Sequence, residues 1–186
     1  MRISSYFIIF VVVLVIRSLS EILLKPKNEN FKNDYKGFVS LIIFVAAFFI
    51  ISLSVGYYIF TDNMINPTIL YIGLLIFILI HIIRILVTRK MKKSYNLYIT
   101  PTEKSQLITT GANNIVRHPI YLLYTLEITA LLMVWFNYIG FVALMIDIIA
   151  TLHRINEEEK LLMNKFKTDY ENYKRKVKYK IFPFIY

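Results

Sequence analysis

Apolar residues in this chain come in long stretches instead of the mixed pattern of a soluble domain. Three stretches, at residues 6–24, 38–60 and 68–87, are long enough to cross about 30 Å of hydrocarbon as helices. Two shorter ones, 120–136 and 138–152, are separated only by Asn137, which predicts a helical hairpin, fully or partly embedded. The pattern predicts an all-α, polytopic membrane helical bundle of five transmembrane segments, forming a single membrane domain over residues 1–186.

Beyond the last apolar segment, hydrophobic side chains recur at helical spacing. The recurring residues are Ile155, Leu162, Phe166, Tyr170, Tyr173 and Val177. Because they are three, four or seven residues apart, they fall on one stripe of a helix. We expect a C-terminal amphipathic helix on the cytoplasmic side, laid against the membrane or the bundle.

Composition agrees with a lipid environment, since 57% of the 186 residues are hydrophobic and 18% are charged. The formal charge of +10 is distributed unevenly, because 19 of the 22 Lys and Arg lie in 25–37, 88–119 and 153–186, and Arg2 alone lies on the opposite face. This bias predicts a cytoplasmic C-terminus and an outside N-terminus, in the cell membrane of a prokaryote or the endoplasmic reticulum of a eukaryote. Topology thus accounts for the charge, and we expect no nucleic-acid partner.

Several kinds of chemistry are excluded by what the sequence lacks. It contains no Cys, its three His have no H-x-x-x-H spacing, and we therefore expect no metal site. Its five Gly form neither a G-x-G-x-x-G nor a Walker pattern. The polar segments are also too short for a nucleotide-binding domain, which takes on the order of 100 residues. Any cofactor must lie in a pocket of short segments at the membrane surface, and residues 102–121 and 153–185 are the two candidates.

The first candidate segment ends in Arg117-His118-Pro119-Ile120-Tyr121. Pro119 suits the first turn of a helix, whose free N–H groups and partial positive charge favour a carboxylate ligand. The alternative is that Arg117 and His118 only extend to the membrane surface and Pro119 only begins a helix.

In the second candidate segment, Arg154 and Glu158 are four residues apart and share a helix face. Asp147 and Thr151 continue that face into the membrane. We interpret the neighbouring Glu157 as part of a solvated helix start, and the same interpretation is the alternative for Arg154 and Glu158.

Five ionisable residues fall inside the other apolar segments, where such groups usually face a bundle interior. Arg17 and Glu21 are one turn apart, so we expect an internal pair. His81 and Arg84 lie near the cytoplasmic end of their segment and are expected to extend towards the surface. Glu127 could line a pocket or pair with Arg84.

These two segments resemble the isoprenylcysteine carboxyl methyltransferase family, small integral-membrane enzymes that use S-adenosylmethionine. The matching residues are Leu107-Ile108-Thr109-Thr110-Gly111, Arg117-His118-Pro119-Ile120-Tyr121, Arg154, Glu158-Glu159, Leu162, Phe166, Tyr170, Tyr173, Val177 and Pro183. The resemblance covers about residues 102–185. Asn113, Leu123 and Lys167 depart from it, because the family pattern has Tyr, Gly and Gly there.

The resemblance implies a methyltransferase that acts on a lipid-tailed acceptor, such as the carboxylate of an isoprenylcysteine-like substrate. Its cofactor, S-adenosyl-L-methionine, would be held by Ser105, Gln106, Leu107, Ile108, His118, Pro119, Ile120, Tyr121 and Glu158. Arg154 would contact the substrate, and Arg154 and Glu158 would be the catalytic pair.

Other functions stay open at this point. A phospholipid amine N-methyltransferase would need a base, for which Glu127 and His118 are candidates. A membrane nicotinamide-dependent reductase and a non-enzymatic membrane protein are alternatives from other classes.

Overall fold

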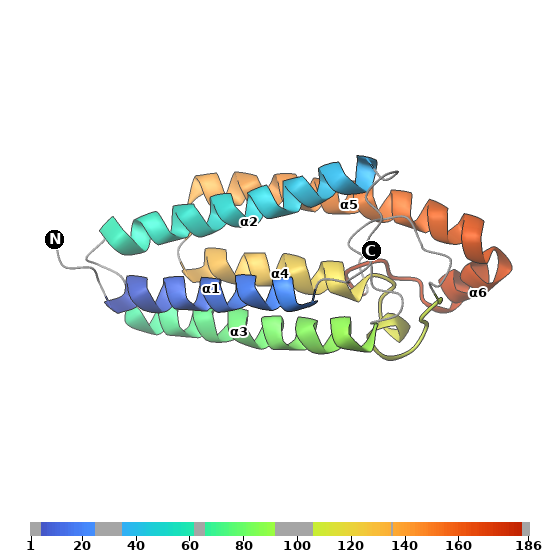
Figure 1. Ribbon diagram of the computed structural model, residues 1–186, viewed down its shortest axis with the longest axis horizontal. Helices are drawn as coiled ribbons and strands as arrows, with labels where there is room; N and C mark the ends of the chain where they lie inside the picture. The colour runs from blue at the N-terminus through green and yellow to red at the C-terminus, as the bar shows by residue number, and fades with distance from the viewer. Residues whose placement is uncertain (1–4, 25–34, 62–65, 92–105, 135, 184–186) are drawn as a thin grey trace.

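The computed structural model describes residues 5–24, 35–61, 66–91, 106–134 and 136–183. Within these ranges the regular elements are six α-helices and one short 3-10 helix (Figure 1). They are α1 (Ser5–Leu24), α2 (Tyr35–Thr61), α3 (Pro67–Lys90), η2 (Gly111–Asn114), α4 (Pro119–Val134), α5 (Tyr138–Phe166) and α6 (Thr168–Lys176). The all-α prediction is therefore confirmed, and a long helix lies over each predicted apolar segment.

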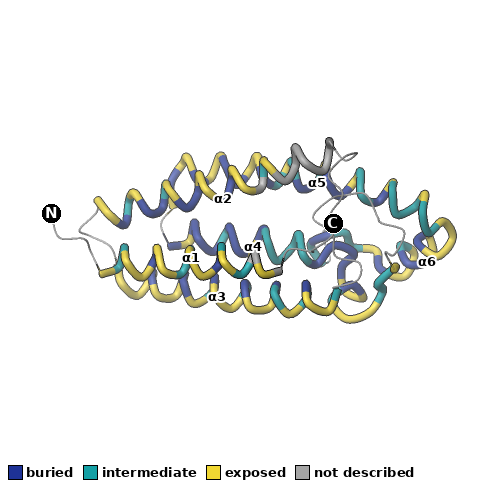
Figure 2. The backbone as a smooth tube through the Cα atoms, viewed as in Figure 1, coloured by how far each residue is buried: buried dark blue, intermediate teal, exposed yellow. Residues whose placement is uncertain are grey.

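Five long helices lie side by side, with α5 packed mainly on α2 and α4 packed mainly on α3 (Figure 1). Their shared core is apolar and includes Phe10, Ile51, Leu70, Phe77 and Leu131, each at most 1% exposed. The outward faces are also apolar, as Leu53, Tyr57 and Ile149 show with more than 60% exposure (Figure 2). Such faces suit contact with lipid instead of water.

Two helices, α3 and α5, are long and apolar enough to cross a membrane by length and composition. The shorter apolar helices are Ser5–Ser20, Val45–Thr61 and Pro119–Val134. Five transmembrane segments and the orientation of the termini therefore stay predictions.

Polar caps and close packing fix where the helices begin and meet. Asn66 caps α3 by accepting the Thr68 N–H at 3.0 Å, and Asn137 caps α5 by accepting the Gly140 N–H at 2.7 Å. Asn137 thus closes the predicted hairpin between α4 and α5. A Cβ on Gly73 would lie 2.6 Å from Val134 Cγ2, so glycine allows α3 and α4 to approach closely.

The C-terminal region corrects one prediction, because two helices replace the expected single amphipathic helix. α5 runs without interruption through Glu157, so no helix starts there, and it ends at Phe166. Lys167 has φ +46°, and the chain then enters α6. This left-handed conformation favours glycine, the residue that the family pattern has at this position. Tyr170 and Tyr173 of α6 then pack back on Phe166.

Candidate functional site

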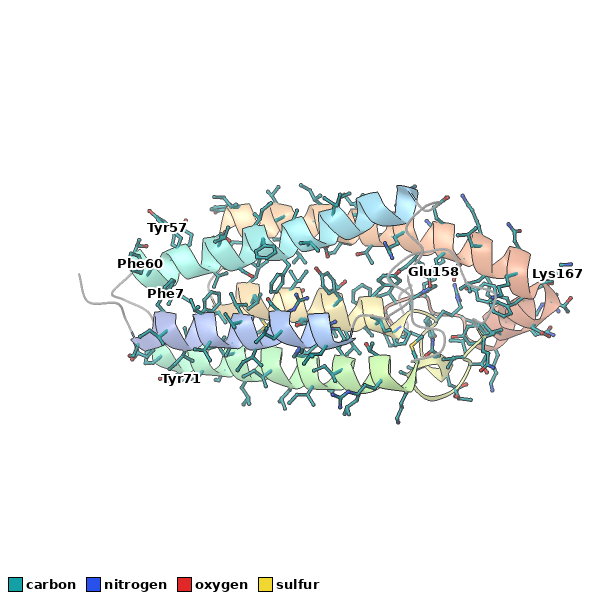
Figure 3. All side chains as sticks on the ribbon, viewed as in Figure 1. Phe7, Tyr57, Phe60, Tyr71, Glu158 and Lys167 are labelled. Atoms are coloured by element: carbon teal, nitrogen blue, oxygen red, sulfur yellow. The ribbon has the colours of Figure 1, made fainter. Side chains whose placement is uncertain are left out.

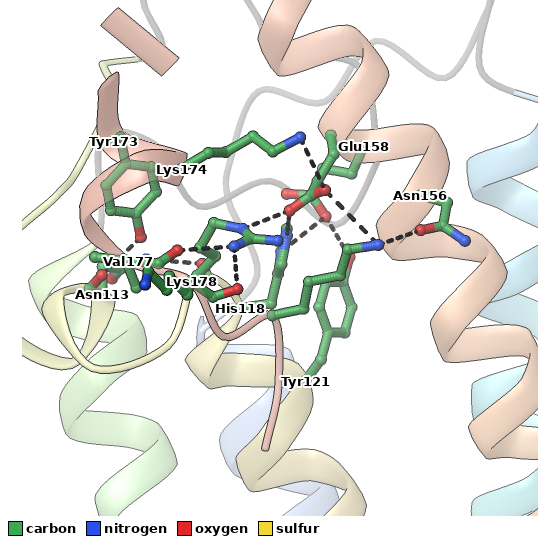
Figure 4. Close-up of polar contacts among 12 residues, drawn as sticks. Asn113, His118, Tyr121, Asn156, Glu158, Tyr173, Lys174, Val177 and Lys178 are labelled. Carbon is green, nitrogen blue, oxygen red and sulfur yellow. Dashed lines mark hydrogen bonds and ion pairs between the residues drawn. The ribbon is translucent and has the colours of Figure 1, made fainter. Parts of the chain in front are cut away.

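The predicted site residues gather at the end of the bundle where α4 begins and α5 leaves its apolar part. Glu158 and Lys167 lie towards this end, whereas Phe7, Phe60 and Tyr71 mark the opposite one (Figure 3). The site is thus built from the start of α4, the polar half of α5, and the segment after α6 (Figure 4).

A continuous chain of hydrogen bonds joins α4 to α5 at the centre of this site. Arg154 Nε donates to Tyr121 Oη at 2.7 Å, and Tyr121 Oη donates to Glu158 Oε2 at 2.9 Å. Arg154 is buried, whereas the Glu158 side chain is 26% exposed and so accessible to a ligand. The structure thus connects the expected substrate residue with two of the expected cofactor residues.

His118 lies between two carboxylates at the start of α4. Its Nδ1 is 3.9 Å from Glu158 Oε2, and its Nε2 is 3.4 Å from Glu159 Oε1. The distance between Nε2 and Glu159 Oε1 is that of an ion pair if the imidazole is protonated, but the two atoms are not hydrogen-bonded. Within the described part of the chain, Nε2 is buried without a hydrogen-bond partner. A polar atom in that condition could be satisfied by a bound ligand.

Arg117 anchors the C-terminal segment to the start of α4. Its Nε donates to Glu159 Oε1, and its Nη1 donates to the carbonyl oxygens of Val177 and Lys178, all at 2.7 Å. The backbone N–H groups of Arg117 and His118 each donate to a carbonyl of residues 179–180 at 2.9 Å. Arg117 is therefore a buried anchor and does not extend to the membrane surface.

Glu159 lies among four basic side chains in this anchor. Arg117 and His118 contact it directly, and Lys174 Nζ and Lys180 Nζ lie 3.9 and 3.8 Å from its Oε2. Burial by itself raises the pKa of the Glu159 carboxyl, but the contacts with His118 and Arg117 outweigh burial and lower the pKa to about 2. The roles of Arg117 and Glu159 were missed by sequence reasoning, although both are adjacent to predicted site residues.

The segment before η2 joins the site only in part. Leu107 packs against the cluster of Tyr170, Tyr173 and Val177. Gln106 is exposed and Ile108 is half-buried. Ser105 lies outside the described residues.

Asn113, where the family pattern has Tyr, serves the local structure. Its side-chain amide donates to the Arg117 carbonyl at 3.2 Å, and its own carbonyl accepts the Tyr173 hydroxyl at 2.7 Å. It therefore helps to position Arg117.

A second polar cluster lies inside the bundle around Glu127, which is fully buried. Arg84 Nε, His81 Nδ1 and Arg17 Nε approach its carboxylate at 2.7, 3.0 and 3.2 Å. His81 Nε2 also lies 2.7 Å from Ser20 Oγ, which ties α1 to α3 and α4. Arg17 Nε donates to Oε1 of Glu127 and Arg84 Nε donates to Oε2, so both oxygens accept a hydrogen bond from a guanidinium.

This cluster settles the open alternatives for the intramembrane charges. Glu127 pairs with Arg84, one of its two expected roles. The expectation that His81 and Arg84 extend to the surface is wrong, because both are buried against Glu127. Arg17 also pairs with Glu127, and the side chain of Glu21, its expected partner, lies outside the described residues.

Comparisons with known proteins agree with the motifs. Residues 72–164, half of the chain, match the model of the isoprenylcysteine carboxyl methyltransferase family. The matched region includes most of α3 and α5 and all of α4, and so contains His118, Tyr121, Arg154 and Glu158. A search of curated proteins found no match.

Proposed function

Because the chain belongs to the isoprenylcysteine carboxyl methyltransferase family and is thus a membrane methyltransferase, we propose that it methylates the carboxylate of a lipid-tailed, isoprenylcysteine-like acceptor. The methyl donor in this proposal is S-adenosylmethionine. The observation that carries the proposal is the hydrogen-bonded chain Arg154–Tyr121–Glu158. It joins the residue expected to hold the acceptor to residues expected to hold the cofactor.

Two features of the site fit this cofactor. Glu158 is partly exposed and can accept hydrogen bonds from hydroxyl or amino groups. His118 lies at the start of α4, where a carboxylate is favoured, and its buried Nε2 makes no hydrogen bond, although it lies 3.4 Å from Glu159 Oε1. Glu158, Tyr121 and His118 would hold the cofactor, which supplies an electrophilic methyl group on a sulfonium.

Arg154 would orient the acceptor. A carboxylate is already ionised at neutral pH and needs no base, so the protein has mainly to align it and exclude water. A guanidinium presents five N–H donors in a fixed fork, which suits a carboxylate while Nε donates to Tyr121. Tyr121 in turn fixes Arg154 relative to Glu158, and so the acceptor relative to the cofactor.

The packing of α4 supports a lateral route for a lipid tail. Residues 120–124 are all partly exposed, whereas deeper residues of α4 such as Thr125, Glu127 and Leu131 are buried. In addition, α4 packs mainly on α3 and α5 packs mainly on α2, so the two helices that carry the site are not each other's main partners. A tail could enter between them, with its polar end at the cytoplasmic face.

A phospholipid amine acceptor is the second candidate, but the site favours it less. An amine must lose a proton before or during methylation and so needs a base. Both carboxylate oxygens of Glu127 are engaged by Arg17, His81 and Arg84, so Glu127 is not placed to take a proton from an acceptor. The buried cation at Arg154 would also repel an ammonium group.

Calorimetric titration of the purified protein with S-adenosylhomocysteine tests the cofactor assignment. We expect binding by the wild type and loss of binding in Glu158→Ala and His118→Ala, with both variants still folded. Glu157→Ala is the matched control, because Glu157 pairs with the exposed Lys160 at 2.7 Å and should not affect binding. Absence of wild-type binding at tens of micromolar would contradict the proposal, and normal binding by both variants would contradict the residue assignments.

The acceptor is tested separately by methylation assays. We expect the purified enzyme to form a base-labile methyl ester on a prenylcysteine analogue and no product on phosphatidylethanolamine. The reverse result would favour the amine methyltransferase.

A further inference from the structure

The backbone at Lys180 is held against the start of α4 by contacts that do not depend on its side chain. The His118 N–H donates to the Lys180 carbonyl at 2.9 Å, and the Arg117 N–H donates to the Tyr179 carbonyl at the same distance. The next residue, Ile181, is 2% exposed and so packs into the protein. The side chain of Lys180 therefore begins at a fixed point beside His118, one of the expected cofactor residues.

From this point the Lys180 side chain extends to α5. Its Nζ donates to Asn156 Oδ1 at 2.7 Å and lies 3.8 Å from Glu159 Oε2. In Figure 4 the contact of Asn156 runs towards the side chains of His118 and Tyr121. The Lys180 side chain is 21% exposed, so a ligand can reach it. Because an ammonium group has three N–H donors, Nζ can donate to a ligand while Asn156 orients it.

The side chains around Lys180 carry an excess of positive charge. Among the described residues, the contacts of the site bring four Lys and Arg side chains together with two carboxylates, those of Glu158 and Glu159. The basic residues are Arg117, Arg154, Lys174 and Lys180. A ligand that brings a carboxylate would offset part of this excess, because opposite charges attract strongly at a partly buried site.

The proposed reaction needs two separate carboxylate sites, because S-adenosylmethionine and the acceptor each carry such a group. Arg154 would hold the carboxylate of the acceptor. Lys180 contacts Asn156, which follows Arg154 by two residues, and residues two apart do not share a helix face. Arg154 and the contact between Lys180 and Asn156 thus lie at different faces of α5. This separation would keep the carboxylate of the cofactor from competing for Arg154.

We propose that Lys180 binds the α-carboxylate in the methionine part of S-adenosylmethionine, and that Asn156 positions the ammonium group of Lys180. This inference rests on the proposed function and adds to the cofactor site a residue from the segment after α6. Charge-assisted hydrogen bonds between an ammonium group and a carboxylate are stronger than neutral ones. The start of α4, with its partial positive charge and His118, would lie beside the same end of the cofactor.

The experiment measures the binding of two ligands to the full-length protein in detergent by calorimetric titration. S-adenosylhomocysteine carries the carboxylate, whereas decarboxylated S-adenosylhomocysteine keeps the adenosine, the thioether and the amine. We expect the wild type to bind the first ligand about 10- to 100-fold more tightly, because hydrogen bonds to charged groups are worth about that factor. In Lys180→Met this ratio of affinities should fall about tenfold, through weaker binding of S-adenosylhomocysteine alone.

Three further variants separate this contact from a general effect of charge or folding. Lys178→Met is the matched control, because it removes an exposed lysine from the same segment and leaves the backbone carbonyl that Arg117 contacts; it should keep the wild-type ratio. Lys180→Arg keeps the positive charge and should keep most of the preference for the carboxylate. Asn156→Ala removes the acceptor that orients Lys180 and should lower the ratio in part.

The outcomes distinguish this inference from the proposed function. An unchanged ratio in Lys180→Met, or an equal loss of affinity for both ligands, overturns the carboxylate contact and leaves the cofactor assignment standing. The same conclusion follows if the wild type binds the two ligands equally well. A wild type that binds neither ligand overturns the proposed function, and the carboxylate contact with it.

Discussion

Replacement of Glu127 by glutamine tests whether the cluster inside the bundle holds α1, α3 and α4 together. Glutamine keeps the length of the side chain and a carbonyl acceptor, so the main change is loss of the negative charge. Arg17 and Arg84 are 9% and 3% exposed and approach the carboxylate at 3.2 and 2.7 Å. After the replacement, both cations would remain buried without this counter-ion.

The expected cost follows from these contacts. Two unit charges 4 Å apart attract by about 4 kcal/mol at an effective dielectric constant of about 20. Two such pairs give a gross loss of about 8 kcal/mol, which relief of the carboxylate's own desolvation and relaxation of the arginines reduce. Removal of one member of a buried ion pair costs about 3–5 kcal/mol in proteins, and we expect Glu127→Gln to fall in that range.

The free energy of unfolding can be measured in mild detergent by titration with a denaturing detergent. Glu171→Gln is the matched control, because Glu171 pairs with Arg175 at 2.8 Å on the surface and both side chains are more than half exposed. That change should cost less than about 0.5 kcal/mol. Adding Arg84→Met to Glu127→Gln should restore part of the loss, because it removes one uncompensated cation. A cost for Glu127→Gln within about 1 kcal/mol of the control would refute this account of the cluster.

Three further predictions concern the site. Arg117→Lys should release the C-terminal segment, because lysine cannot contact Glu159 and two carbonyls together. The rate of amide hydrogen exchange at residues 177–181 should then rise about tenfold or more. An unchanged exchange rate would contradict the role of Arg117 as an anchor. Because the pKa of Glu159 is about 2 in the folded protein, its stabilisation is complete above about pH 4.5 and is lost as the pH falls towards 2. It amounts to at most about 3 kcal/mol, and Glu159→Gln should flatten the acid limb of the stability curve. Tyr121→Phe removes the link from Arg154 to Glu158 and should lower kcat/KM by about 10- to 100-fold, and it should also weaken S-adenosylhomocysteine binding because Tyr121 is expected to help hold the cofactor. An unchanged kcat/KM would show that the link does not position the acceptor.

The helices could be predicted because their signals are local in the sequence. Apolar stretches gave the segments, and Asn137, which caps α5, gave the turn between the last two. The break at Lys167 could not be predicted from hydrophobic periodicity, because Phe166, Tyr170 and Tyr173 keep helical spacing through it. The only signal in the sequence was that Lys167 stands where the family pattern has glycine. The positive φ of Lys167 is the reason that glycine is favoured there.

In the polar clusters too, contacts between residues close in the sequence could be predicted, whereas contacts between distant residues could not. Arg154 and Glu158 could be placed on one face because they are one turn apart in a single helix. The partners of Glu127 lie 43, 46 and 110 residues away on two other helices, and periodicity does not identify such pairs. Sequence reasoning gave Arg17 a partner one turn away, Glu21, whose side chain lies outside the described residues, and it did not identify the contact of Arg17 with Glu127.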